Sequence, residues 1–223
     1  MLRKAHKIYI YGDWQKEVTG VDDNKQFWQR FAFAYEPFMK SNKRLYKDIC
    51  DSIKPYLNKN MNVLELACGT GQLSFPLCSK VKLWEATDFS EKMIAEAKKK
   101  NGSSRLYFSV QDATDLPYAD NSFDAVVISN ALHIMPHPEK ALSEIYRVLK
   151  EDGKLFAPTF VHGDSVGFYI RTWLLERFGF RAYFKWNETE FAEFLKDNGF
   201  EIVEQKTMGS NIAPLCFVTA NKA

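Results

Sequence analysis

The sequence predicts an α/β fold in which helices cover both faces of a mostly parallel sheet. From Asn60 onward, short apolar runs alternate with amphipathic stretches, as is typical of strand–helix–strand units. Near the C-terminus, two strand-like runs at 200–207 and 213–220 are joined by Gly209-Ser210-Asn211. This pattern predicts a hairpin whose last strand runs antiparallel to its neighbours. The length of 223 residues, with 46% hydrophobic and 26% charged residues, fits one globular domain.

Charge and cysteine content argue against several classes of protein. The formal net charge is only +2 and the charges are interspersed, which disfavours a dedicated nucleic-acid binder. None of the four cysteines forms a C-x-x-C pair or lies near a histidine at ligand spacing, so we expect neither disulfides nor a metal. No apolar run approaches the roughly 18 residues of a membrane span, and no signal peptide is evident. We therefore expect a cytoplasmic protein.

We expect a single domain over residues 1–223 with four successive parts. Residues 1–58 would form an N-terminal extension and a helical cover that is interrupted near Pro37. Residues 60–160 hold the alternating strands and helices. Residues 162–186, rich in aromatic and basic side chains, would form a lid. Residues 187–223 would complete the fold with a helix and the hairpin.

Five apolar runs predict the parallel strands, and the stretches between them predict helices. The expected strands lie at 61–66, 81–87, 106–110, 123–128 and 154–160. Ser90 is a favourable N-cap for a helix over 91–100. Apolar residues at helical spacing between 141 and 149 predict another helix, which Asp152-Gly153 would end. A last amphipathic helix would stop at Asn198-Gly199.

A glycine turn follows the first expected strand. The run Val63-Leu64-Glu65-Leu66-Ala67-Cys68-Gly69-Thr70-Gly71 places two glycines where a ligand can approach the backbone without a Cβ in the way. In such sheets, ligands bind beyond the carboxyl ends of the strands. Ser74 stands where a dinucleotide-binding motif has its third glycine, and Glu65 is unfavourable beside a pyrophosphate. The turn therefore favours a ligand that carries positive charge.

Two more acidic residues stand where the next two expected strands end. Asp88 can accept hydrogen bonds from both hydroxyls of a ribose, and Asp112 can accept one from the exocyclic amine of adenine. Either residue alone would be interpreted as a solvated strand end. Together with Glu65 beside the glycine turn, they indicate a site for an adenosine-bearing ligand.

Three segments resemble the class I S-adenosylmethionine-dependent methyltransferases, in particular the small-molecule branch that includes the ubiquinone/menaquinone C-methyltransferases. They are Glu65 to Gly71, Asp88-Phe89-Ser90 with Met93, and Asp112-Ala113-Thr114-Asp115-Leu116-Pro117-Tyr118-Ala119-Asp120-Asn121-Ser122-Phe123-Asp124, continuing through 129–133 to 144–150. The resemblance is most specific between about residues 60 and 160. It implies a Rossmann-like sheet of seven strands, S-adenosylmethionine as cofactor, and methyl transfer to a small or lipophilic acceptor.

The resemblance also implies roles for the matching positions. Glu65 would attract the methionine ammonium group, Asp88 would bind the ribose hydroxyls, and Phe89 or Met93 would pack on adenine. The other implied cofactor-binding positions are Ala67, Cys68, Gly69 and Gly71 under the methionine and ribose, Asp112 and Ala113 at the adenine edge, and Asn130 and Tyr35 at the methionine end.

The acceptor side is less constrained by the sequence. His133 follows the fourth expected strand and is a candidate general base, although it could instead shape the loop. His162, Trp173 and Tyr183 are candidates for substrate contact, and the aromatic lid suits a lipid, a quinone-like molecule or an aromatic or acidic metabolite. Nucleic-acid amino methylation is disfavoured, because Ser129-Asn130-Ala131-Leu132 replaces the Asp/Asn-Pro-Pro-aromatic run of those enzymes.

Two other functions stay open. An NAD(P)-dependent oxidoreductase would share the fold, but Glu65 and the missing third glycine count against it. A catalytically silent protein that binds the cofactor or a partner would keep the same residues and consume no methyl groups.

Overall fold

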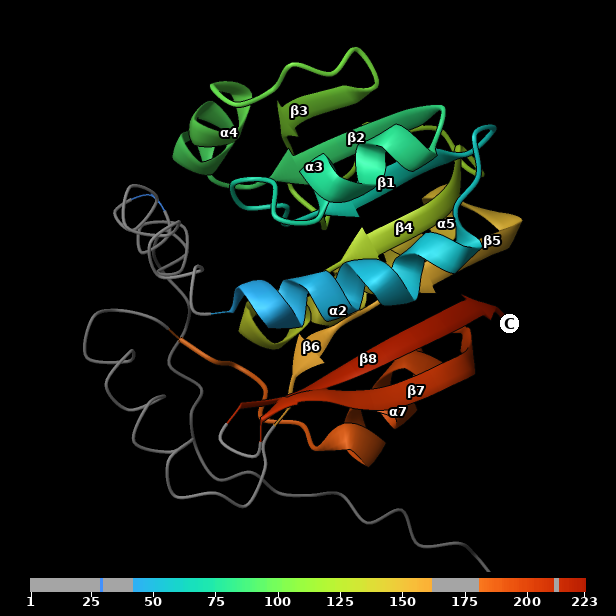
Figure 1. Cartoon of the computed structure of the whole chain (residues 1–223). Helices are drawn as coiled ribbons and strands as arrows, with labels where there is room; N and C mark the ends of the chain where they lie inside the picture. Colours follow the sequence, from blue (N-terminus) through green and yellow to red (C-terminus); the bar gives the residue numbers. More distant parts are fainter. Residues whose placement is uncertain (1–28, 30–41, 162–180, 211–212) are drawn as a thin grey trace, which may run out of the picture.

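A computed structural model of the chain describes Gln29 and residues 42–161, 181–210 and 213–223, which form one eight-stranded sheet with helices on both faces (Figure 1). The strands are β1 (Asn62–Leu66), β2 (Leu83–Asp88), β3 (Leu106–Val110), β4 (Phe123–Ile128), β5 (Leu149–Phe156), β6 (Thr159–Phe160), β7 (Phe200–Ser210) and β8 (Ala213–Lys222). Among these residues, the expectation of a mixed α/β fold is confirmed.

The strand order is β3-β2-β1-β4-β5-β8-β6, and β7 pairs with β8. Strands β1 to β5 are parallel, whereas β8 is antiparallel to β5, β6 and β7, as the hairpin pattern predicts. Strands β2 and β3 follow on one side of β1, and β4 pairs with β1 on its other side. The carboxyl ends of β1 and β4 therefore form the switch point at which such sheets bind ligands.

The expected fifth strand at 154–160 is divided in two. Strand β5 ends at Phe156, and the two-residue β6 resumes after Ala157-Pro158, because proline has no N–H to donate to a ladder. The short β6 is thus an addition to the seven strands that the resemblance implies.

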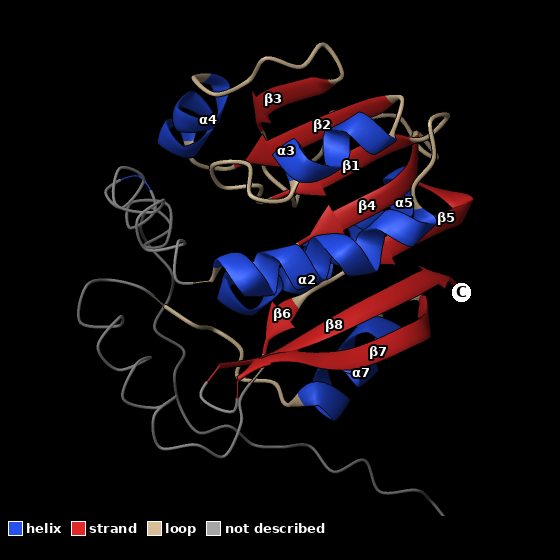
Figure 2. Cartoon of the chain, viewed as in Figure 1, coloured by secondary structure: helices blue, strands red, loops and turns tan. Residues whose placement is uncertain are grey.

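Helices flank both faces of the sheet (Figure 2). They are α2 (Lys43–Ile53), α3 (Ser74–Leu77), α4 (Glu91–Lys98), α5 (Pro138–Val148) and α7 (Glu188–Asp197), with 3₁₀ turns η1 (Lys54–Tyr56), η2 (Cys78–Lys80) and η3 (Leu132–Ile134). Helices α2 and α3 cover the face toward the viewer, and α5 and α7 lie behind it. None of the helices in the described ranges is long and apolar enough to cross a membrane.

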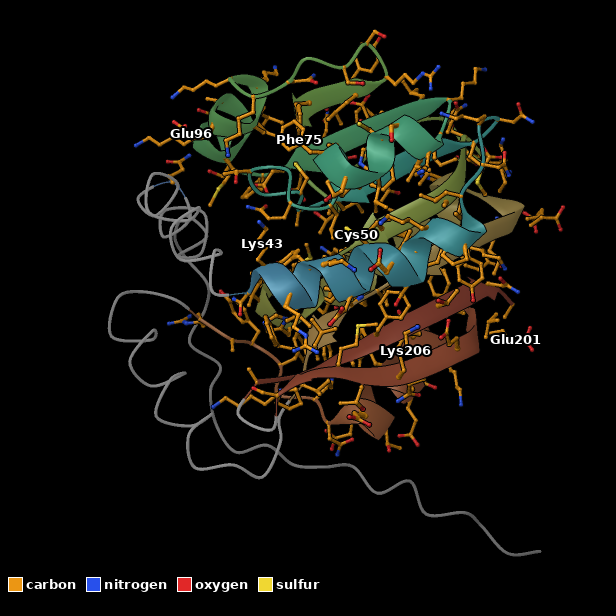
Figure 3. The ribbon with its side chains drawn as sticks, in the orientation of Figure 1. Lys43, Cys50, Phe75, Glu96, Glu201 and Lys206 are labelled. Atoms are coloured by element: carbon orange, nitrogen blue, oxygen red, sulfur yellow. The ribbon has the colours of Figure 1, made fainter. Side chains whose placement is uncertain are left out.

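Each face of the sheet has its own hydrophobic core. Ile49 of α2, Leu77 of α3 and Ile94 of α4 pack against one face together with Trp84 of β2. Side chains of α2 and α3, such as Cys50 and Phe75, fill this layer in Figure 3. On the opposite face, buried residues of α5 and α7 pack against β4, β5 and β8. Burial on both faces fixes the strand register and so places the strand ends.

One expected helix start and one expected helix stop are confirmed. The Ser90 hydroxyl accepts a hydrogen bond from the Met93 amide at the start of α4. At the other end of the chain, α7 stops at Asp197 before Asn198-Gly199. Gly199 has a φ of 87°, which a residue with a side chain rarely adopts.

The expectation that Asp152-Gly153 ends a helix is wrong. Helix α5 stops at Val148, and Leu149 is already extended and paired with Phe123. The pairing of β4 then moves from Leu149 to Lys154, so residues 150–153 form a bulge within β5. The turn-forming residues belong to this bulge, where a Cβ on Gly153 would lie 2.7 Å from the Leu149 side chain.

Two other expectations fall partly outside the described residues. The helices expected over 24–56 are represented by α2 and η1, and the part around Pro37 is not described. The described end of the proposed lid, residues 181–186, is irregular and leads through Asn187 into α7.

Candidate functional site

The strand ends at the switch point have an unusual backbone conformation. Ala67, directly after β1, has a φ of 53°, and Asn130, after β4, has a φ of 54°. Gly69 and Gly71 follow with φ angles of 56° and 91°. Left-handed conformations at non-glycine residues cost energy and concentrate at functional sites. Their position at two neighbouring strand ends indicates a binding site there.

Backbone hydrogen bonds connect each of these ends to its neighbours in the sheet. The Cys68 amide donates to Thr87 O at 2.9 Å and joins the glycine turn to β2. The Gln111 amide donates to Asp88 O at 3.2 Å, and the Asn130 amide donates to Pro158 O at 2.8 Å. The first two bonds fix the glycine turn relative to the ends of β2 and β3, and the third fixes the residue after β4 relative to the segment after β5.

Asp88 is the last residue of β2 and contacts the glycine turn. Its Oδ2 accepts the Gly69 amide and its Oδ1 accepts the Ser90 amide, both at 2.8 Å. Burial raises the pKa of Asp88 to about 6, an effect that the two amides partly offset. Each carboxylate oxygen has more than one lone-pair site. The residue can therefore hold the turn and still accept hydrogen bonds from two ligand hydroxyls.

Glu65 is a buried carboxylate of β1 with only 2% of its surface exposed. Its Oε2 accepts the Ser74 hydroxyl at 2.5 Å and the Trp84 Nε1 at 2.7 Å. Burial raises the pKa of Glu65 to about 7, and the charge of Asp88 adds to this increase. Two carboxylates in a desolvated site favour a ligand that brings positive charge.

An apolar surface adjoins Asp88. Phe89 is 36% exposed and Val110, which pairs with Asp88 across β2 and β3, is 41% exposed. Met93 is only 2% exposed. Of the two residues suggested for packing on adenine, Phe89 therefore offers the accessible surface.

Asp112 and Ala113 follow β3 at the same edge of the sheet. Asp112 is exposed, and its Oδ1 accepts both the amide and the hydroxyl of Thr114, at 2.8 and 2.7 Å. Ala113 is 9% exposed and packs into the core on the α5 side. The local hydrogen bonds orient the Asp112 carboxylate without occupying both of its oxygens.

Cys68 is 4% exposed within the glycine turn. Burial raises its pKa well above the ordinary value, which favours the thiol over the nucleophilic thiolate. Among the residues that the structure describes, no group of histidine, cysteine, aspartate and glutamate side chains could hold a metal ion.

On the acceptor side, the structure brings His133 and Tyr183 together. The His133 carbonyl oxygen in η3 accepts the amides of Tyr183 and Phe184, at 3.0 and 3.1 Å. Three half-buried rings continue from there, with ring centroids 4.8 Å apart for Phe184 and Trp186 and 4.6 Å apart for Trp186 and Phe194. The expected site residues Tyr35, His162 and Trp173 lie outside the described residues.

Tyr46 of α2 contacts the end of β4, which the sequence does not reveal. Its hydroxyl accepts a hydrogen bond from Asn130 Nδ2 at 3.3 Å, although the two residues are 84 positions apart. Asn130 Oδ1 accepts the Phe160 amide at 3.2 Å. Both polar ends of the Asn130 side chain thus have protein partners, which fixes the orientation of this side chain at the end of β4.

Replacing Gly71 with alanine is expected to lower the free energy of unfolding by about 3 kcal/mol, from backbone strain and steric overlap together. A Cβ there would lie 2.6 Å from the Phe75 ring and 3.3 Å from Phe108, at a φ of 91°. Urea unfolding measures the change. Gly102→Ala is the control, because no atom lies within 4 Å of the place that its new methyl group would take. Equal stabilities for the two variants would contradict this view of the turn.

Comparison with known proteins agrees with this geometry. Residues 64–157 match a family model described as a methyltransferase domain. The chain is 37% identical over 127 residues to the ubiquinone/menaquinone biosynthesis C-methyltransferase UbiE of Rickettsia bellii, over 52% of this chain and 50% of that protein. The matched part thus spans about half the length of that relative. Against the protein of the same name from Rickettsia prowazekii, identity is 30% over 205 residues, covering 77% of this chain and 80% of the relative.

The fold is also found in a solved structure of a SAM-dependent methyltransferase from Thermotoga maritima. It has a TM-score of 0.70 and 23% identity, covering 89% of this chain and 99% of that one. The resemblance seen in the sequence is thereby confirmed at the level of the family and of the fold. The chain belongs to the class I S-adenosylmethionine-dependent methyltransferases.

Proposed function

We propose that the chain transfers a methyl group from S-adenosylmethionine to a small or lipophilic acceptor with a quinone-like ring. The observation that carries the proposal is the placement of two carboxylates, the buried Glu65 and the half-buried Asp88, beside a glycine turn at the switch point of the sheet. The residues fit the cofactor, because it combines a sulfonium, an ammonium group and two vicinal ribose hydroxyls.

Each part of the cofactor has a matching group in the chain. Glu65 supplies negative charge for the ammonium group, and Asp88 accepts the ribose hydroxyls. Phe89 offers a ring to the adenine face, while Asp112 and Ala113 lie toward its edge. The cofactor, when bound, supplies a methyl group that is already activated on a positively charged sulfur. The protein therefore has to align the acceptor and exclude water.

Two observations support a quinone-like acceptor. The relatives carry names for ubiquinone and menaquinone biosynthesis C-methylation. In addition, the rings of Phe184, Trp186 and Phe194 adjoin the segment that docks on His133, and stacked rings of this kind favour a flat aromatic molecule. The reduced acceptor is the reactive form, since only a hydroquinone has an electron-rich ring carbon.

His133 is proposed as the base of this reaction. In such a transfer the ring carbon of the acceptor would supply the electron pair for its new bond to the methyl group, and the sulfur would leave as the neutral thioether. That carbon must then lose its proton, and His133 would accept it at the acceptor end of the site. Tyr183, which is held by the His133 carbonyl, would help to position the acceptor.

An assay with isotopically labelled S-adenosylmethionine tests the function. We expect mass spectrometry to detect methylated product from a reduced demethylated quinone, and less or none from a fatty acid or an aromatic acid. His133→Asn should lower kcat about 100-fold while leaving the affinity for S-adenosylhomocysteine unchanged. Calorimetric titration with NAD(H) provides the comparison with an oxidoreductase. Tight NAD(H) binding, or cofactor binding without methyl transfer to any reduced ring, would contradict the proposal.

A further inference from the structure

Arg147 on α5 connects that helix to the loop between β3 and β4. Its guanidinium group donates five hydrogen bonds. Two reach the carbonyl oxygens of Tyr118 and Leu116, at 2.7 and 2.9 Å, and one reaches Asp120 Oδ1 at 2.8 Å. The other two reach the Glu144 carboxylate at 2.9 and 2.7 Å. The planar group of an arginine can satisfy such a set, whereas the point charge of a lysine cannot.

Glu144 completes this connection. Its Oε2 accepts the Leu116 amide at 2.8 Å as well as the Arg147 guanidinium. Both the N–H and the C=O of Leu116 are therefore bound by the same two side chains of α5. The Leu116 side chain is 4% exposed and packs into the core with Ile145. Backbone and side chain together fix this point of the loop on α5.

The fixed part of the loop lies a few residues after Asp112 and Ala113. An isolated bridge between Asp112 and Asp115 and the hydrogen bonds from Thr114 make the intervening segment a tight local unit. No helix lies between β3 and β4 in this fully described stretch, so the position of the unit depends on its two ends. One end follows β3, and the other is Leu116, which Glu144 and Arg147 of α5 bind.

We propose that Arg147 and Glu144 are positioning residues that set the specificity of the site for a 6-aminopurine. By fixing Leu116 they keep the Asp112–Ala113 segment in the position where it contacts the exocyclic amine of adenine. The inference rests on the proposed function, because it takes the nucleoside of the cofactor to lie at this loop. Neither residue touches the cofactor; they act through the loop.

Calorimetric titration with two nucleosides tests this role. The probes are S-adenosylhomocysteine and its analogue in which a 6-oxo group replaces the 6-amino group. In wild type we expect the amino compound to bind more tightly. The preference is the ratio of the two dissociation constants. In Arg147→Met, which keeps the aliphatic stem, this ratio should fall about 10-fold, because one hydrogen bond to a charged group would be lost. Arg147→Lys should not restore it, and kcat at saturating cofactor should change less than the affinity.

The control is Lys150→Met. Lys150 lies three residues further along the chain, and its Nζ pairs with Asp124 Oδ1 of β4 at 2.6 Å rather than with the loop. It should keep the wild-type preference. If Arg147→Met does not fold, Glu144→Gln is measured in the same way and should also show a reduced preference. An unchanged preference, or equal weakening for both nucleosides, would overturn the positioning role. A wild-type protein that binds neither nucleoside would refute the proposed function itself.

Discussion

Asp88→Asn is expected to weaken the binding of S-adenosylmethionine about 100-fold, because the variant loses charge-assisted hydrogen bonds to both ribose hydroxyls. An amide has one acceptor oxygen, whereas the carboxylate accepts Gly69 with one oxygen and Ser90 with the other. The variant therefore also leaves one backbone amide facing an NH₂ group. Isothermal titration calorimetry at pH 8, where Asp88 with its pKa of about 6 is ionised, measures the loss.

Glu85→Gln is the matched control for Asp88→Asn. Glu85 lies on the same strand, and its Oε1 accepts hydrogen bonds from Ser109 at 2.9 Å and Tyr118 at 3.2 Å. It should keep the wild-type affinity. Thermal unfolding of both variants separates loss of binding from loss of fold. If a folded Asp88→Asn protein bound the cofactor as tightly as wild type, the proposed position of the ribose would be wrong.

Glu65→Gln is expected to change the pH dependence of stability in the ligand-free protein. The free energy of unfolding of the variant, minus that of wild type, should rise by on the order of 3 kcal/mol between pH 4.5 and pH 8. The pKa of Glu65 rises from 4.5 in an exposed carboxyl group to about 7 in the fold. Between these values the native state binds more protons than the unfolded state. The contribution of Glu65 to wild-type stability should therefore be greatest below pH 4.5 and should decrease as the pH rises through 7.

The glutamine at position 65 removes this dependence. Its amide oxygen can accept from Trp84 and Ser74 as the carboxylate does, and it never ionises. Urea unfolding of wild type and variant between pH 5 and pH 8 gives the comparison. Parallel stability curves for the two proteins would show that Glu65 does not carry the raised pKa.

The same substitution should weaken cofactor binding. A cationic ligand favours the ionised form of Glu65, so its binding to wild type near pH 7 should release protons. Titrations in two buffers with different heats of ionisation measure this release, which we expect to be smaller in Glu65→Gln. Proton release that is identical in the two proteins would argue against an interaction between Glu65 and the ammonium group.

Much of the cofactor side of the site follows from local sequence. Each strand end is determined by an apolar run and the residue that follows it, so Glu65, Asp88 and Asp112 could be placed on one edge of a parallel sheet. Ser90 was predictable as a cap because its hydroxyl bonds to an amide three residues away. The glycine turn and the C-terminal hairpin also depend on residues that are close together in the chain.

The partners of these residues were decided by tertiary structure. The sequence does not reveal that Trp84 and Ser74 share one oxygen of Glu65, or that Tyr46 bonds to Asn130. It also placed Asp152-Gly153 at a helix end, although the pairing of β4 with β5 makes the segment a bulge. The hydrogen bonds from Arg147 to a loop about thirty positions away in the chain are likewise not evident from the sequence. Turns and caps depend on short-range backbone preferences, whereas these contacts exist only after packing has brought separate segments together.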